Sequence, residues 1–232
     1  MIAVVGGIKG GSGKSTVATN LCIMRALEGR DVLLVDADDQ ETASDFTAHR
    51  NSQTSGLAGY TSIKLGGMAL RNQVLRLKSK YEDIIIDTGG RDTSSQRAAL
   101  TVADVLLVPF LPRSFDVWTL EQVSSLVDEM RQANLGLKAY VFLNRADHRG
   151  QDNSEAMERL KESDTFEFIE APLGSRKAFG NAAASGLAVC ELVPADPKAI
   201  REISKLYHLI FKQTNVADNT NHKTMEANRA TA

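Results

Sequence analysis

Two lysines enclose a glycine-rich segment near the start of the chain. The segment reads Lys9-Gly10-Gly11-Ser12-Gly13-Lys14-Ser15-Thr16. An apolar run at residues 2–5 precedes it, and a helical pattern over 17–28 follows it. In a turn between a strand and a helix, backbone N–H groups point at a bound anion, and the helix N-terminus adds partial positive charge. The spacing therefore predicts a phosphate-binding loop, in which Lys14 contacts the β and γ phosphates and the Ser15 hydroxyl binds Mg²⁺.

Aspartates follow two further apolar runs. Asp36 and Asp38 come after residues 32–35, and Asp87 comes after residues 84–86. Carboxylates at the ends of buried strands would lie at the rim of a sheet, beside the phosphate-binding loop. Magnesium nucleotide sites use such oxygen ligands, and phosphoryl transfer to water needs a group that orients the water. The alternative for Asp36 and Asp87 is an ordinary helix cap after a strand–helix turn.

These three segments resemble the motifs of the ParA/MinD family of ATPases, whose phosphate-binding loop is called a deviant Walker A motif. The ordinary loop pattern has glycine where this chain has Ile8, and Lys9 is the family's additional cation. The resemblance implies that Lys9 crosses a dimer interface to the partner's nucleotide and takes part in catalysis with Lys14. It also implies that Asp38 positions the hydrolytic water. A solvated surface lysine is the alternative for Lys9.

The same resemblance assigns the remaining site residues. It implies that Asp36 supports the metal shell, that Asp87 holds Mg²⁺ through water, and that Asn144 hydrogen-bonds adenine. An amide offers both a donor and an acceptor, although a plain turn-forming asparagine is the alternative. The family's motifs read roughly V-D-x-D-P-Q and I-I-I-D-x-P-P, so Asp39 and Gly89-Gly90 replace prolines. These departures put the rigidity of both segments in doubt.

Short apolar runs alternate with helical patterns along the chain. The predicted strands cover residues 2–5, 32–35, 84–86, 105–110 and 139–143; the predicted helices cover 17–28, 70–80, 94–102, 119–134 and 153–161. This alternation predicts an α/β fold with a doubly wound, mostly parallel sheet and helices on both faces. We expect irregular structure over residues 47–67. We also expect one ATPase domain at 1–212 and a disordered polar tail at 213–232.

Composition limits the possible functions. The 232 residues carry a formal net charge of −2, so any contact with nucleic acid must come from a local basic patch. Cys22 and Cys190 lie far apart, which favours a reducing, cytoplasmic compartment. The chain has no apolar run long enough for a membrane span. The first predicted strand leaves no room for a signal peptide or an N-terminal DNA-reading module.

A basic stripe marks the last predicted helix, which begins at Pro197. At 100° per residue, one face carries Lys198, Arg201, Lys205, His208 and Lys212. The opposite face is apolar and would pack on the sheet. A solvated charged face is one interpretation. The family resemblance favours the other, non-specific binding to DNA phosphates, with Arg176 and Lys177 extending the surface.

The resemblance is nearest to short ParA- or ParF-type partition ATPases. It implies a nucleoid-associated ATPase with ATP and Mg²⁺ as cofactors and a weak intrinsic rate. Two copies would pair on ATP and bind DNA, and a centromere-binding, ParB-like partner would stimulate hydrolysis. An ATPase that positions a protein cargo, a MinD-like membrane regulator and a metabolic ligase of the same superfamily remain alternatives. Composition of the tail argues against membrane binding.

Overall fold

The structure is a computed structural model that describes residues 1–112, 117–147 and 151–211, except for the side chains of residues 117, 118 and 151. The predicted disordered tail at 213–232 and the predicted DNA contact Lys212 lie outside the described residues. No helix in the described ranges is long and apolar enough to cross a membrane.

A parallel sheet forms the centre of the fold. Across the described residues it contains seven strands in the order β3-β2-β4-β1-β5-β6-β7. The strands are β1 (Ile2–Val5), β2 (Val32–Ala37), β3 (Thr61–Lys64), β4 (Asp83–Thr88), β5 (Val105–Phe110), β6 (Lys138–Leu143) and β7 (Glu167–Phe168). Most consist of β-branched and other apolar residues, because both faces of the sheet are covered.

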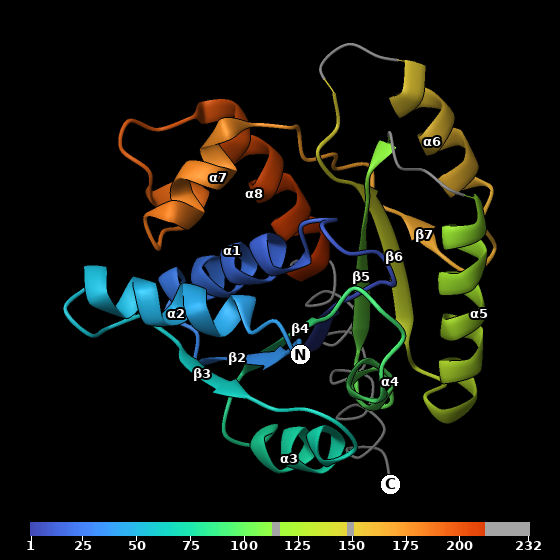
Figure 1. Cartoon of the computed structure of the whole chain (residues 1–232), viewed down its shortest axis with the longest axis horizontal. Coiled ribbons are helices and arrows are strands. Elements are labelled where there is room, and N and C mark those ends of the chain that lie inside the picture. Colours follow the sequence, from blue (N-terminus) through green and yellow to red (C-terminus); the bar gives the residue numbers. More distant parts are fainter. Residues whose placement is uncertain (113–116, 148–150, 212–232) are drawn as a thin grey trace, which may run out of the picture.

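Helices cover both faces of the sheet (Figure 1). One face packs against α3 (Ala69–Leu77), α4 (Ser94–Leu100), α5 (Val117–Ala133) and α6 (Gln151–Lys161). The other packs against α1 (Lys14–Leu27), α2 (Thr42–Gln53), α7 (Lys177–Ala184), the short 3₁₀ helix η2 (Val189–Glu191) and α8 (Pro197–Phe211). The predicted doubly wound α/β fold is therefore confirmed.

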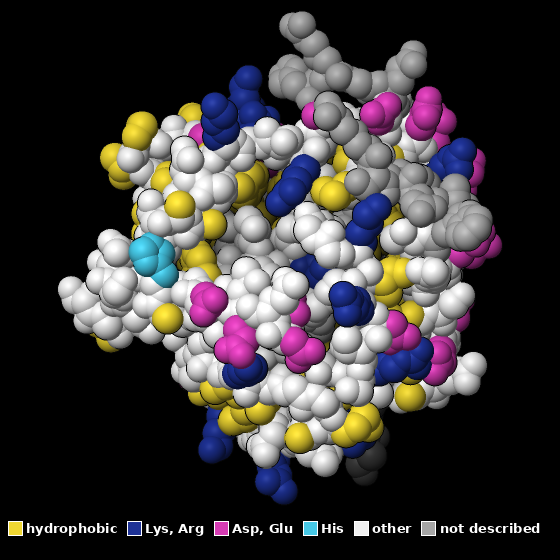
Figure 2. Space-filling model, in the orientation of Figure 1, with side chains coloured by type: hydrophobic (Ala, Val, Ile, Leu, Met, Phe, Trp, Pro, Cys, Tyr) yellow, Lys and Arg dark blue, Asp and Glu magenta, His cyan; other side chains and the backbone are white. Residues whose placement is uncertain are grey.

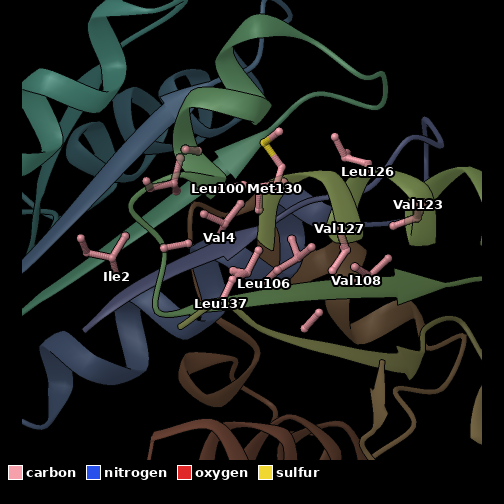
Figure 3. Packing of buried hydrophobic residues seen from close by; sticks show 14 of the residues in the cluster. Ile2, Val4, Leu100, Leu106, Val108, Val123, Leu126, Val127, Met130 and Leu137 are labelled. Carbon is pink, nitrogen blue, oxygen red and sulfur yellow. The ribbon is translucent and has the colours of Figure 1, made fainter. Parts of the chain in front are cut away.

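Alternating side chains of β1, β2, β4, β5 and β6 supply two hydrophobic cores. In β1, Ile2 and Val4 belong to the core beneath α4 and α5, whereas Val5 belongs to the core beneath α1 and α8. Figure 3 shows the first core, where Val4 and Leu106 lie near Leu100 and Met130. Burial on this scale makes the sheet a rigid support for the loops at its carboxyl edge.

The expectation of irregular structure over residues 47–67 is wrong. Helix α2 continues to Gln53, and Thr61–Lys64 form the edge strand β3. Neither element has a clear apolar pattern: α2 buries only Ala43, Thr47 and Arg50, and no residue of β3 is fully buried. Polar contacts hold α2 instead. Arg50 donates to the Ala58 carbonyl at 2.7 Å and to the Gly186 carbonyl at 2.9 Å.

Candidate functional site

The carboxyl ends of the central strands carry the predicted site residues. The phosphate-binding loop leaves β1 and enters α1 directly after Gly13, whose φ of 90° is left-handed. A side chain at Gly13 would also collide with the Asn144 amide, because an ideal Cβ would lie 2.3 Å from its nitrogen. Glycine at this position therefore satisfies both the turn and the packing beneath it.

A cavity of about 570 Å³ opens over this loop. The loop contributes Gly10, Gly11, Gly13, Lys14, Ser15 and Thr16 to its lining. Asp38 lines it as well, as do Gly89 and Gly90 from the segment after β4. A cavity of this size, bordered by backbone amides and a buried lysine, suits the phosphate groups of a small ligand.

Lys14 lies inside the loop rather than at the surface. Its ammonium group donates a hydrogen bond to the Lys9 carbonyl at 2.9 Å, and only 6% of the residue is exposed. Burial lowers the pKa of Lys14, and the carboxylates of Asp87 and Asp38 oppose that shift. A desolvated ammonium beside a phosphate-sized cavity interacts strongly with an anion. Ser12, by contrast, does not line the cavity, and its hydroxyl donates to the Lys9 carbonyl.

Asp87 is buried without partners. It is 0% exposed, and neither carboxylate oxygen has a hydrogen-bond partner in the described part of the chain. Burial raises the pKa of Asp87 to about 7; the nearby Ser15 hydroxyl and the Lys14 charge limit that rise, although neither lies in hydrogen-bonding geometry with the carboxylate. A buried carboxylate without partners carries a high desolvation cost, which a hard cation with oxygen ligands would offset. Asp87, with Ser15 beside it, therefore fits Mg²⁺.

Asp36 occupies the matching position on the neighbouring strand, where β2 and β4 pair it with Asp87. Unlike Asp87, Asp36 accepts hydrogen bonds on both oxygens, from the Asp38 N–H at 3.1 Å and the Ser44 N–H at 2.7 Å. The second bond caps the first turn of α2, as the capping alternative predicts. In this structure Asp36 thus fixes the backbone that carries Asp38; its place in a metal shell stays a prediction.

Asp38 reaches the cavity from the loop after β2. Its Oδ1 accepts from the Gln40 N–H at 3.2 Å, and an ideal Cβ on Gly89 would lie 3.0 Å from the same oxygen. The missing side chain at Gly89 leaves room for the Asp38 carboxylate. Gly89-Gly90 in place of the family's proline pair therefore has a packing role here. The catalytic role of Asp38 stays a prediction.

Asn144 and Lys9 lie beside the cavity and do not line it. The Asn144 amide donates to the Ser12 carbonyl at 2.6 Å, and its oxygen accepts from the Arg145 N–H at 3.0 Å. Asn144 thus braces the loop, and its contact with adenine stays a prediction. Lys9 is half-buried and borders the end of β5 near Val108, outside the cavity of its own chain. Its action on a partner's nucleotide also stays a prediction.

Two arginines to which the sequence assigned no role of their own also line the cavity. Arg91 follows Gly89-Gly90, and Arg145 follows Asn144 with a left-handed φ of 51°. Both are exposed. The only signal in the sequence was their position directly after Gly90 and Asn144.

The predicted DNA surface is partly assembled on α8. Lys198, Arg201 and Lys205 are exposed on the side opposite the buried Ile203 and Leu206. The segment before α7 joins this helix through a bidentate ion pair, in which Arg176 Nε and Glu202 Oε2 lie 2.8 Å apart.

That pair neutralises Arg176, whereas Lys177 is exposed. On the face shown in Figure 2, basic and acidic side chains are interspersed, with no broad area of one sign. DNA binding by these residues stays a prediction.

Comparisons with known proteins identify the family of the chain. Residues 2–189 match the CobQ/CobB/MinD/ParA nucleotide binding domain family. Maintenance of carboxysome distribution protein A of Halothiobacillus neapolitanus is 26% identical over 209 residues, covering 89% of this chain and 94% of that protein.

Two solved structures share the fold. The Cyanothece McdA(D38A)–ATP complex has a TM-score of 0.73 at 17% identity, covering 88% of this chain and 93% of that one. A putative plasmid partition protein of Borrelia burgdorferi B31 bound to AMPPNP has a TM-score of 0.72 at 19% identity, covering 91% and 98%. The family match extends from β1 through the phosphate-binding loop to η2, and the chain therefore belongs to the CobQ/CobB/MinD/ParA nucleotide binding domain family.

Proposed function

We propose that this chain is a Mg²⁺-dependent ATPase that pairs around ATP, binds DNA without sequence preference, and segregates a DNA cargo. A DNA-bound, ParB-like partner would stimulate hydrolysis and so release the pair from DNA. The protein would then act in the cytoplasm, on the nucleoid. The observation that carries the proposal is the buried, unpartnered Asp87 next to Lys14 and Ser15, at the floor of a phosphate-binding loop.

The site supplies the parts that ATP hydrolysis requires. Lys14 and the loop amides bind phosphates, Ser15 and Asp87 hold Mg²⁺, and Asp38 orients the attacking water. Magnesium supplies positive charge at the phosphate oxygens when bound. The position of Lys9 outside its own cavity supports a contact with the nucleotide of a second copy.

Dimerisation would make the affinity for DNA depend on which nucleotide is bound. A single α8 presents three exposed cations, Lys198, Arg201 and Lys205, which is a weak phosphate-binding surface alone. Two copies on one duplex bind much more tightly, because the second contact is intramolecular. ATP-dependent pairing would therefore switch DNA binding on, and hydrolysis would switch it off.

A second candidate is positioning of a protein cargo by the same ATP cycle. The similarity to Maintenance of carboxysome distribution protein A, over 89% of this chain, favours it. In this case the phosphate-binding loop of this chain would still bind ATP and its basic surface would still bind DNA. Only the partner that stimulates hydrolysis would differ.

Binding to random-sequence duplex DNA tests the shared part of both candidates. We expect tight binding with ATP and Mg²⁺, weak binding with ADP, and a steep loss of affinity as salt rises. The Lys14→Ala variant should bind DNA weakly under every nucleotide condition. Identical DNA affinity with ATP, with ADP and without nucleotide would contradict the proposal.

A further inference from the structure

Arg91 stands at the rim of the cavity on a segment that touches the phosphate-binding loop. An ideal Cβ on Gly90 would lie 2.6 Å from both the Cα and the N of Gly10, closer than any side chain tolerates. The backbone at Gly90 therefore rests directly on the loop. Arg91 is the next residue, is exposed, and lines the same cavity as Lys14.

The nearest acid in sequence is already engaged. Asp92 accepts from Arg97 on both oxygens, with Nε and one terminal nitrogen each 2.7 Å away. Arg97 also donates to Glu129 at 2.5 Å. Arg91 itself makes no hydrogen bond or ion pair with any residue in the described ranges. Its guanidinium thus has no partner that holds it away from the cavity, which Asp38 and Asp39 also line.

The surroundings indicate which part of the ligand Arg91 faces. Gly89, two residues earlier, packs against Asp38, the residue assigned to the hydrolytic water. That water attacks the terminal phosphate, so the segment carrying Arg91 borders the terminal-phosphate end of the cavity. A guanidinium presents paired N–H groups that match the oxygens of a phosphate.

We propose that Arg91 binds the terminal phosphate of the nucleoside triphosphate in its own cavity and distinguishes ATP from ADP. This inference rests on the proposed nucleotide-binding function and adds a specificity residue to it. Two features of this chain place the arginine there. Gly90 lets the segment lie directly on the loop, and Arg97 binds both oxygens of Asp92, so Asp92 does not pair with Arg91.

Calorimetric titration with AMPPNP and with ADP, both with Mg²⁺, tests the assignment. Arg91→Ala should weaken AMPPNP binding about tenfold or more and ADP binding less than about threefold, because only AMPPNP retains the terminal phosphate. Arg91→Lys should give an intermediate loss for AMPPNP, because it keeps the charge without the paired donors. Arg76→Ala removes an exposed arginine from α3, outside the cavity, and should change neither affinity.

The outcomes distinguish nucleotide binding by the protein from the specific role of Arg91. Wild-type protein that binds neither nucleotide would overturn the proposed function itself. Normal wild-type binding with an unchanged Arg91→Ala variant, or an equal loss for both nucleotides, would overturn only the role of Arg91.

Discussion

Asp36 and Asp87 show how two chemically identical side chains acquire different tasks. They are paired across β2 and β4, and both are 0% exposed. Backbone N–H groups of Asp38 and Ser44 satisfy Asp36, so its burial is explained by the fold. Asp87 has no such partner among the described residues, and the proposed Mg²⁺ would satisfy its oxygens.

Asp87→Asn should therefore raise the stability of the protein while impairing its site. At pH 8 in a chelating buffer, we expect the free energy of unfolding to rise by about 1 to 3 kcal/mol, because the substitution removes a desolvated charge. Binding of AMPPNP with Mg²⁺ should fall at the same time. Urea denaturation and calorimetric titration measure the two effects.

Asp36→Asn is the matched control, and its stability should change in the opposite direction. An amide can accept only one of the two backbone hydrogen bonds well, so unfolding should become easier by about 1 to 3 kcal/mol. Destabilisation by both substitutions would contradict the distinction between the two aspartates.

The sequence predicted the residues of the phosphate-binding loop because their types and order are tied to one chemistry. It did not predict Arg91 or Arg145 in the cavity lining, because nothing local tells a solvated arginine from one aimed at a ligand. The bracing of Ser12 by Asn144 joins residues 132 positions apart and depends on the register of the sheet.

At the level of elements, the segment after β4 can lie directly against the phosphate-binding loop because Gly90 has no side chain. Gly90 meets Gly10 backbone to backbone. A residue with a Cβ must move one of the two segments by several tenths of an ångström or more, and the loop geometry suffers either way. Glycines in place of the family's proline pair make the backbone of this segment less rigid, and the contact between Gly90 and Gly10 restricts it again.

Gly90→Ala should lower the affinity for AMPPNP about tenfold and lower the free energy of unfolding by about 1 to 3 kcal/mol, because the new Cβ would collide with the backbone of Gly10. Calorimetric titration gives the affinity. Gly180→Ala, on α7, is the control: its new Cβ meets nothing within 4 Å, and helix propensity should stabilise it by about 0.5 to 1 kcal/mol. Undiminished AMPPNP binding by Gly90→Ala would contradict the close approach.

Helix α2 depends on one buried arginine instead of an apolar face. The Arg50 guanidinium binds both oxygens of Glu191, each 2.8 Å away, in addition to the carbonyls of Ala58 and Gly186. This explains why hydrophobic periodicity did not predict the element. The other helices over residues 69–161 were predicted to within about three residues at each end, because their apolar stripes face the sheet.

Arg50→Ala should destabilise the protein by about 3 kcal/mol, because Glu191 and two carbonyls lose their donor in a largely buried place. Urea denaturation measures the loss. Arg71→Ala, which removes an exposed arginine from α3, should change stability by no more than about 0.5 kcal/mol. A similar effect of the two substitutions would show that α2 is held by other contacts.

At the scale of the whole molecule, the nucleotide cavity and the basic face of α8 lie on different elements that share one core. Val5 of β1 and Ile203 of α8 belong to the same hydrophobic cluster, so both surfaces are fixed to one sheet. Because the formal net charge of −2 gives no overall attraction to DNA, any DNA contact would come from such local basic surfaces. In the proposed mechanism, two such surfaces in one dimer would together bind a DNA duplex.

Replacing Lys198, Arg201 and Lys205 together by alanine should weaken DNA binding in the ATP state without altering AMPPNP affinity. Three cations per chain make six in a pair, so the slope of log affinity against log salt should become shallower by up to about 5. Fluorescence anisotropy over a salt series measures it. An unchanged slope would place the DNA contacts elsewhere.

The central claim is that ATP and Mg²⁺ hold two copies together through the phosphate-binding loops. Light scattering of the Asp38→Ala variant, which should keep ATP intact, tests it most directly. The account predicts a molar mass twice that of one chain with ATP and Mg²⁺, that of a single chain with ADP, and that of a single chain for Asp38→Ala combined with Lys9→Ala. A single-chain mass with saturating ATP and Mg²⁺, or an equal dimer with and without Lys9, would contradict it.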